Sequence, residues 1–234
     1  MNKILSLLTL LLCVSIVVSC SEEKEEPPTS ITLSPEGRIM HHGETLQLTA
    51  TPNRGVSFVS ENKNIASVNS SGQVQAVLIG KTRIVASAGS AVAYCEIDVR
   101  PKVINLPEPL LLFGRNIDEV KKLFDATYPS AQYEVIGEEG AFARYFPNYR
   151  VEKRRIPLYV IYRSDDNGNL ISVTYKALAW HNLLKEYTSE RYLSTDKLVK
   201  GDYEFLSVDE RIRVLVSPYS DSYHYATFLH GPRP

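Results

Sequence analysis

The stretch Gly43-Glu44-Thr45-Leu46-Gln47-Leu48-Thr49-Ala50 indicates what kind of fold this chain forms. After the glycine, Leu46, Leu48 and Ala50 alternate with polar residues, so in an extended strand they share one face. One apolar face and one polar face are typical of a strand that packs on a core and meets water on its other side. Pro52 follows and ends the predicted strand.

The same alternation recurs on both sides of this stretch. Short apolar strands are separated by turn signals, of which Asn69-Ser70-Ser71-Gly72 is the clearest, because Gly72 suits a positive φ angle. Cys95 shares one side of the last strand with Ile97, so we expect its thiol to be buried. Many short strands with regular turns predict a β-sandwich over residues 31–101.

The order of these landmarks resembles a known family. Ile31-Thr32-Leu33, the run 43–50, Ile65-Ala66-Ser67-Val68-Asn69-Ser70-Ser71-Gly72 and Gly80-Lys81-Thr82-Arg83-Ile84 stand as they do in the group 2 bacterial immunoglobulin-like (Big) domain. Phe58 stands where that family usually has Trp, and the smaller ring leaves the fold plausible. The resemblance implies an Ig-like sandwich, found in surface adhesins and as a spacer in extracellular proteins. Because the chain holds a single copy, we expect a spacer.

The N-terminus predicts export and lipid attachment. Residues 1–19 combine a basic start with an apolar run that is too short to span a bilayer, which is typical of a secretory signal peptide. Val17-Val18-Ser19-Cys20 resembles the lipobox, in which signal peptidase cuts before a cysteine that carries diacylglycerol. The resemblance implies that Cys20 is the lipid-attachment residue and that the signal peptide is removed.

Residues 20–30 are expected to form a disordered tether, because they combine an acidic run with prolines. The run Ser21-Glu22-Glu23-Lys24-Glu25-Glu26 is similar to the export signal that sends lipoproteins of the Bacteroidetes group to the outer face of the outer membrane. This similarity implies that membrane lipid is one partner of the protein. We therefore expect a chain anchored in the outer membrane through acylated Cys20 and facing outward.

Charge and cysteine content exclude other classes. The chain has 26 Lys and Arg against 27 Asp and Glu, so no global field recruits nucleic acid. Of its three cysteines, Cys13 leaves with the signal peptide and Cys20 carries lipid, which leaves Cys95 alone. We therefore expect no internal disulfide, and stability must come from packed cores.

Residues 106–234 change to a mixed pattern that predicts an α+β domain. A helix begins near Asn116, whose pairing with Glu119 resembles a capping box, and a second helix is predicted over 178–192. Asp165-Asp166-Asn167-Gly168-Asn169 predicts a hairpin. The order helix, strands, helix, strands favours one antiparallel sheet with both helices on one face, and two related helix-plus-meander units are one way to build it. This half resembles no named family.

Motifs for catalysis, cofactors and metals are missing from the sequence: it has no phosphate-binding glycine loop, His-Glu-x-x-His helix or Gly-x-Ser-x-Gly elbow. His41 and His42 are adjacent and would point to opposite faces of a strand, and the 165–169 run has its glycine in the wrong position for a calcium loop. We therefore predict no catalytic residue, no cofactor and no metal. The histidines His181, His224 and His230, which could pair with Asp209 or Asp221 as general bases, are expected to be structural.

Tyrosines gather in the second domain, for example Tyr145 and Tyr149. Their rings stack on sugars and anchor protein contacts, although tyrosine also simply suits strands. The candidate ligand-binding residues are Tyr219, Tyr223 and Tyr225, and the basic run 150–155 is a second candidate, for anions.

These features together predict a non-enzymatic, surface-exposed lipoprotein whose Ig-like stalk presents the C-terminal domain to a glycan, peptide or partner protein. The alternatives are a hydrolase or other enzyme in residues 106–234, or a purely structural component of the envelope. A deep pocket with convergent polar residues would favour the enzyme, whereas an exposed aromatic patch would favour the binding protein.

Overall fold

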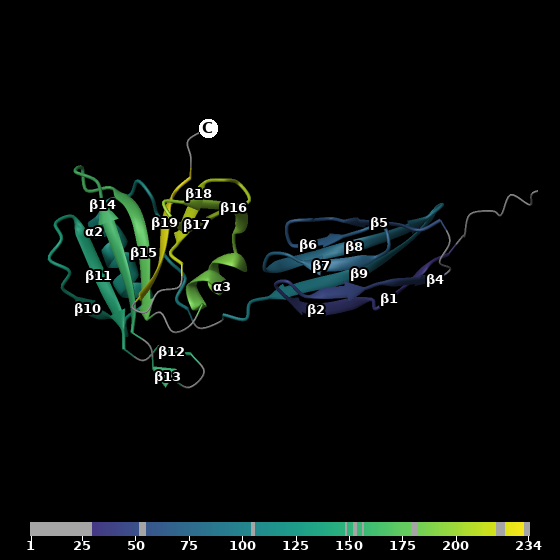
Figure 1. Ribbon diagram of the computed structural model, residues 1–234, viewed down its shortest axis with the longest axis horizontal. Helices are drawn as coiled ribbons and strands as arrows, with labels where there is room; N and C mark the ends of the chain where they lie inside the picture. The colour runs from purple at the N-terminus through teal and green to yellow at the C-terminus, as the bar shows by residue number, and fades with distance from the viewer. Residues whose placement is uncertain are drawn as a thin grey trace, which may run out of the picture.

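A computed structural model of the chain describes residues 30–51, 55–103, 106–147, 149–151, 154–155, 157–178, 182–218 and 223–231. Two domains follow one another along the chain and lie end to end (Figure 1). The signal peptide, Cys20 and all but the last residue of the predicted tether fall outside the described residues, so these parts of the sequence analysis stay predictions.

The first domain is the expected all-β sandwich. Its described strands form a four-stranded sheet in the order β2-β9-β8-β5, a three-stranded sheet in the order β3-β7-β6, and the separate pair β1-β4. The pair β2 and β9 is parallel, whereas the others are antiparallel. The strands are β1 (Thr32–Ser34), β2 (Gly37–His41), β3 (Thr45–Gln47), β4 (Thr49–Thr51), β5 (Ser57–Ser60), β6 (Ala66–Val68), β7 (Gln73–Ala76), β8 (Gly80–Ala88) and β9 (Ala91–Arg100).

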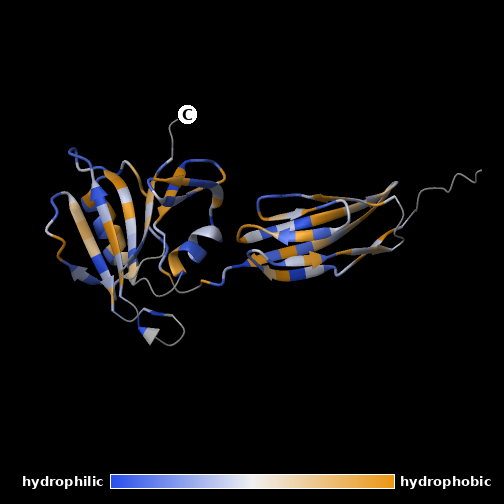
Figure 2. Ribbon diagram, in the orientation of Figure 1, coloured by the Kyte–Doolittle hydropathy of each residue, from blue (hydrophilic) through white to orange (hydrophobic). Residues whose placement is uncertain are grey.

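The sandwich closes over alternate residues of these strands, as the alternation of colours along each arrow in Figure 2 shows. Ile84, Cys95 and Ile97 are at most 1% exposed, so the predicted burial of Cys95 is confirmed. Phe58 packs against this core, and its ring fills the space beside Gly72, where an added Cβ would lie 3.0 Å from the ring. Gly72 has a φ of +80°, as the predicted turn requires.

The run that revealed the sandwich is not one strand, as predicted, but two. β3 pairs with β7, whereas β4 pairs with β1, and Leu48 stands between them. The Leu48 amide still donates to the carbonyl of Gly72 at 2.9 Å, so the break costs no hydrogen bond. Leu48 itself is 3% exposed, and the alternation is kept across the break.

The second domain is built on one eight-stranded antiparallel sheet in the order β10-β11-β14-β15-β19-β18-β17-β16. Each half of the sheet is a helix followed by a four-stranded meander, and the halves meet where β15 pairs with β19. The expected arrangement of two helix-plus-meander units is therefore confirmed at the level of topology. The elements are α2 (Ile117–Thr127), β10 (Gln132–Glu134), β11 (Ala141–Phe146), a small hairpin of β12 (Arg150–Val151) and β13 (Arg154–Arg155), β14 (Leu158–Ser164), β15 (Leu170–Leu178), α3 (Leu183–Ser189), β16 (Leu193–Val199), β17 (Asp202–Leu206), β18 (Ile212–Val216) and β19 (Tyr223–His230).

Local signals explain the start of α2. The Asn116 side chain accepts a hydrogen bond from the amide of Asp118 at 2.9 Å, which confirms the predicted N-cap. Val120 and Phe124 then point into the core. Gly168 and Asn169 form part of the hairpin turn, as predicted. In this turn the Asp165 carboxylate accepts a hydrogen bond from the amide of Asn169 at 2.8 Å.

The predicted second helix over 178–192 is too long at both ends, because α3 spans Leu183–Ser189. Leu178 is the last residue of β15, and α3 begins at Leu183. β15 is paired along its length with β14 on one side and β19 on the other, and this long-range pairing overrides the helical period of the sequence. Leu183, Leu184 and Tyr187 do face the core, as the period predicted.

The proline-rich junction is not a free connection between the domains. Residues 110–113 pack against the core of the second domain, and buried tyrosines hold the chain just before them. The Tyr162 hydroxyl accepts the amide of Leu110 at 3.0 Å, and the Tyr175 hydroxyl donates to the carbonyl of Pro107. The junction is therefore part of the C-terminal fold.

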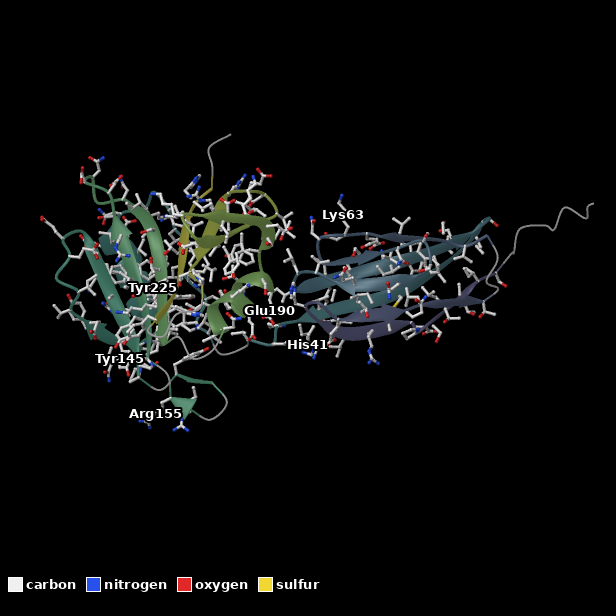
Figure 3. All side chains as sticks on the ribbon, in the orientation of Figure 1. His41, Lys63, Tyr145, Arg155, Glu190 and Tyr225 are labelled. Carbon is white, nitrogen blue, oxygen red and sulfur yellow. The ribbon has the colours of Figure 1, made fainter. Side chains whose placement is uncertain are left out.

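Glu190, directly after α3, joins the two domains. Its backbone carbonyl accepts the amide of Ile79, from the loop before β8 of the Ig-like domain, at 2.9 Å. Its carboxylate, in a residue only 2% exposed, accepts the amides of Lys102 and Val103 at 2.7 and 3.3 Å. Figure 3 shows Glu190 on the side of the second domain that faces the sandwich. Glu190 therefore accepts one backbone hydrogen bond from the Ig-like domain and two hydrogen bonds from the segment that connects the domains.

Candidate functional site

The two faces of the eight-stranded sheet differ. On the central strand β15, Val173, Tyr175 and Ala177 join the core under the helices. Ser172, Thr174 and Lys176 alternate with them and therefore point to the opposite face. No helix among the described residues packs on that second face. We call it the open face.

Five residues stand directly opposite one another across the open face. They occupy adjacent strands from β10 to β19, and the register pairs them one after the other: Gln132, Tyr145, Tyr159, Lys176 and Tyr225. Because neighbouring strands lie about 4.8 Å apart, the row is about 19 Å long. Such a row gives a ligand side chains to contact at each strand that it crosses.

Rings and one cation make up the middle of the row. The rings of Tyr145 and Tyr159 are stacked, with centroids 5.0 Å apart and an interplanar angle of 27°. Lys176 Nζ lies 5.6 Å from the centroid of Tyr159 and 4.3 Å from that of Tyr223, so cation–π attraction holds it between two rings. Tyr225, on the other side of Lys176, is 40% exposed. We call Tyr145, Tyr159, Lys176, Tyr223 and Tyr225 the tyrosine–lysine cluster.

Burial raises the pKa of Tyr159 above its ordinary value, and the nearby charges of Tyr223, Glu134 and Tyr145 act in the same direction. Its hydroxyl is therefore a neutral donor and acceptor near pH 7. The row beside the cluster supplies further hydroxyls, because Thr174 and Thr227 lie 3.2 Å apart, oxygen to oxygen. The open face thus combines ring surfaces, neutral hydroxyls and one ammonium group.

The structure brings two of the three predicted ligand-binding tyrosines together. Tyr223 and Tyr225 share the open face, which confirms that these alternate positions point the same way. Tyr219 and the run 152–153 of the basic loop lie outside the described residues, so their roles stay predictions. Arg150 and Arg155, in the hairpin of that loop, are exposed. Figure 3 labels Tyr145 and Tyr225 on the sheet, and Arg155 on the small hairpin.

Sequence reasoning missed Tyr159 and Lys176 as members of the site. Both alternate with core residues of their own strands and so point to the open face, but their cross-strand partners lie 14 to 49 residues away in the chain. The alternation of β14 and β15 could have assigned their face, but not their neighbours.

Other tyrosines have structural roles. The hydroxyl of Tyr128 donates to the carbonyl of Glu108 at 2.8 Å, and that of Tyr187 donates to the Glu108 carboxylate at 2.5 Å. With Tyr162 and Tyr175, they hold the junction on the helix-covered face. Some of the tyrosines in the second domain therefore stabilise its fold and are not available to a ligand.

The histidines do not converge on a recognisable catalytic group within the described parts of the chain. His224 is buried on the helix-covered side, and burial lowers its pKa. Asp209, one of its predicted partners, instead accepts hydrogen bonds from Ser207 Oγ at 2.6 Å and the Arg211 amide at 3.2 Å within its own turn. His181 and Asp221 are outside the described residues.

Two of the hollows lined by described residues lie away from the cluster. One, of about 810 Å³, lies on the Ig-like domain between β2, β8 and β9, where Arg83 pairs with Glu61 at 2.8 Å. The other, of about 650 Å³, lies at the end of β15 and includes Asp165 and His230. The Asp165 carboxylate there accepts amides of its own hairpin turn, and the His230 ring lies edge-on to Phe113.

Within the segments that the structure describes, no group of three or more His, Cys, Asp or Glu side chains is placed to hold a metal ion. The same segments contain no helix with the length and apolar character needed to cross a membrane.

Comparison with known proteins defines the class of the first domain. Residues 27–97 match the model of the bacterial Ig-like domain (group 2), so this part of the chain is a bacterial Ig-like domain and the predicted resemblance is confirmed. No curated protein matches the chain significantly.

Solved structures with detectable similarity include an intimin mutant from EHEC O157:H7 and fragments of the S-layer protein SbsC. The intimin structure is 17% identical, covers 52% of this chain and 80% of its own, and has a TM-score of 0.25. Domains 5–6 of SbsC are 14% identical, cover 89% of this chain and 87% of their own, and have a TM-score of 0.26. TM-scores of this size do not establish a shared overall fold.

Proposed function

We propose that this protein is a non-enzymatic lipoprotein of the bacterial cell surface. In this proposal, Cys20 anchors it in the outer membrane, the Ig-like domain is a stalk, and the C-terminal domain binds a glycan, peptide or protein partner on its open face. The observation that carries the binding role is the row of aromatic rings in register across that face. Aromatic rings offer flat apolar surfaces to sugar rings and are enriched in the energetic centres of protein interfaces.

The arrangement of the domains supports the stalk. Strands β1 and β4 lie at the end of the sandwich farther from the C-terminal domain, so a chain anchored before β1 would hold that domain outward (Figure 1). β9 has ten residues and extends about 33 Å, to which the tether adds at most roughly the same length. The hydrogen bonds that Glu190 accepts from Ile79 and Lys102 would restrict the movement of the C-terminal domain on this stalk.

Binding is tested with a glycan array and a peptide array probed with the full-length protein and with Tyr225→Ala. We expect the variant to lose at least tenfold in affinity, because a large ring at the centre of a binding surface contributes about 1–2 kcal/mol or more. Tyr133→Ala is the matched control: this tyrosine is 65% exposed, but it pairs with Arg144 on the other face of the sheet. Equal losses for both variants would show that the open face is not the site.

Anchoring and display are tested in cells. Cys20→Ala should release the protein from the membrane fraction, because the acyl chains would be lost. Protease added to intact cells should digest the wild-type protein. Complete protection of the wild-type protein would contradict outward display, and membrane retention of Cys20→Ala would contradict the lipid anchor.

A further inference from the structure

Lys176 is the centre of the open face. It lies on β15, one of the two middle strands of the sheet, and its ammonium group is held between the rings of Tyr159 and Tyr223. The side chain is partly buried, and no carboxylate of the described residues forms an ion pair with it. An ammonium group has three N–H donors, and its contacts with two neutral rings are cation–π contacts. The ammonium group of Lys176 can therefore still donate hydrogen bonds to an anion.

The arginines of this sheet differ from Lys176 in this respect. Arg144 contacts Asp125 at 2.7 Å, Arg163 contacts Glu138 at 2.9 Å, and Arg213 lies 3.9 Å from Glu204. Among the residues that the structure describes, each of these arginines has a carboxylate partner, whereas the lysine in the aromatic row has none. Charge complementarity at the centre of the cluster calls for a negatively charged group from the ligand.

The position of the row favours a carbohydrate over a peptide. Extended peptides bind sheets by pairing with the free backbone groups of an edge strand. The tyrosine–lysine cluster instead spans β11, β14, β15 and β19, which are inner strands whose backbone groups already pair with their neighbours. A ligand there meets side chains only, and these are ring faces and hydroxyl groups, which match the C–H faces and hydroxyls of sugars.

We infer that the tyrosine–lysine cluster binds acidic polysaccharides, with the carboxylate of a uronic-acid unit on Lys176 and sugar rings packed on the neighbouring tyrosines. This inference rests on the proposed binding role of the open face and names the chemical class of its ligand. The neighbouring row contains two acidic residues among those described, Glu134 on β10 and Glu204 on β17. Each lies three strands away from Lys176, and Glu204 lies 3.9 Å from Arg213. An acidic chain that lies along the row from Tyr145 to Tyr225 is therefore compatible with the charges present.

The test compares polysaccharides that differ only in charge. Polygalacturonate, alginate and hyaluronate are immobilised beside their methyl-esterified forms, together with poly-L-glutamate and neutral glycans, and the full-length protein is titrated over them. We expect at least one acidic polysaccharide to bind about tenfold or more tightly than its ester, and the preference to weaken with added salt. Lys176→Gln should lose the preference while it keeps residual binding to the ester.

Lys185→Gln is the matched control, because Lys185 Nζ also lies over a ring, 3.9 Å from the centroid of Tyr203, but on the helix-covered side. This variant should bind like the wild type. If Lys176→Gln fails to fold, the ester comparison on the wild-type protein still decides the question.

The other outcomes separate the two proposals. Equal binding of acids and esters, or binding of neutral glycans alone, overturns the acidic class but leaves glycan binding by the open face in place. Binding of poly-L-glutamate without any polysaccharide shows an acidic peptide ligand and also overturns this inference. If none of these probes binds, the inference fails, and the glycan and peptide arrays probed with Tyr225→Ala decide the broader binding role separately.

Discussion

Replacement of Glu190 by alanine should destabilise the C-terminal domain and loosen its hold on residues 102–103, which connect it to the Ig-like domain. The Glu190 carboxylate accepts the buried amide of Val103 and the more accessible amide of Lys102, and it contacts Arg191 at 3.4 Å. Without it, the Val103 amide loses its partner in a place that water does not reach freely. An unsatisfied buried donor costs about 1–3 kcal/mol, and the weaker terms from Lys102 and Arg191 add roughly 1 kcal/mol more.

The expected loss in the free energy of unfolding is therefore about 3 kcal/mol, which lowers the Tm of a domain of this size by roughly 10–20 °C. Urea unfolding followed by far-UV circular dichroism measures the loss, and small-angle X-ray scattering measures whether the domains spread apart. Glu186→Ala is the control, because Glu186 is an exposed residue of the same helix and should change the free energy by no more than about 0.5 kcal/mol. A Glu190→Ala variant as stable and as extended as the wild type would refute the role of the Glu190 side chain in holding the segment between the domains.

Three further results are expected. Asp125→Ala should cost about 3 kcal/mol in urea unfolding, because Arg144 is 4% exposed and would lose its carboxylate partner; a change below 0.5 kcal/mol would contradict this. Stability should hold up to about pH 10 and fall between about pH 10 and 12, because burial raises the pKa of Tyr149 and Tyr192 to about 12, whereas unfolded tyrosines lose their protons near pH 10; a flat alkaline profile would contradict this. Cys95 should resist alkylation until the protein unfolds, because burial raises the pKa of its thiol to about 11, and mass spectrometry of its peptide would reveal early labelling.

Much of the fold could be predicted because its signals are local. Alternation around Leu46 marks half-buried strands, the sequence 165–169 marks a hairpin, and Asn116 marks a helix start. Each of these depends on residues within a few positions of one another, so the sequence alone carries the information.

The elements that the sequence did not predict correctly depend on pairing between strands or on an irregular backbone. The sequence does not indicate β16 as a strand, because Asp196 adopts a φ of 58° inside a bulge and breaks the alternation. The sequence does not indicate β2 as a strand either, because its hydrogen bonds go to β9, more than 50 residues away, in a parallel pair. The second helix was predicted too long because pairing with β19 extends β15 to Leu178.

The candidate site likewise has features that local sequence predicts and features that depend on long-range pairing. The sequence indicates that Tyr223 and Tyr225 share a face, because side chains alternate along any strand. It cannot indicate that Lys176 lies beside Tyr225, since only the order of strands in the sheet makes them neighbours.

The amino-acid sequence by itself determined the class of the first domain, the burial of Cys95 and the α+β character of the second, because these follow from short-range periodicity. It also carries the prediction of a lipid anchor at Cys20, which rests on a short motif. Only the tertiary structure decided that the junction near Glu108 belongs to the second core, that Glu190 joins the domains, and that a row of rings surrounds Lys176. The physical reason is that each of these depends on contacts between residues far apart in the chain, whose pairing is set by the packing of the whole sheet.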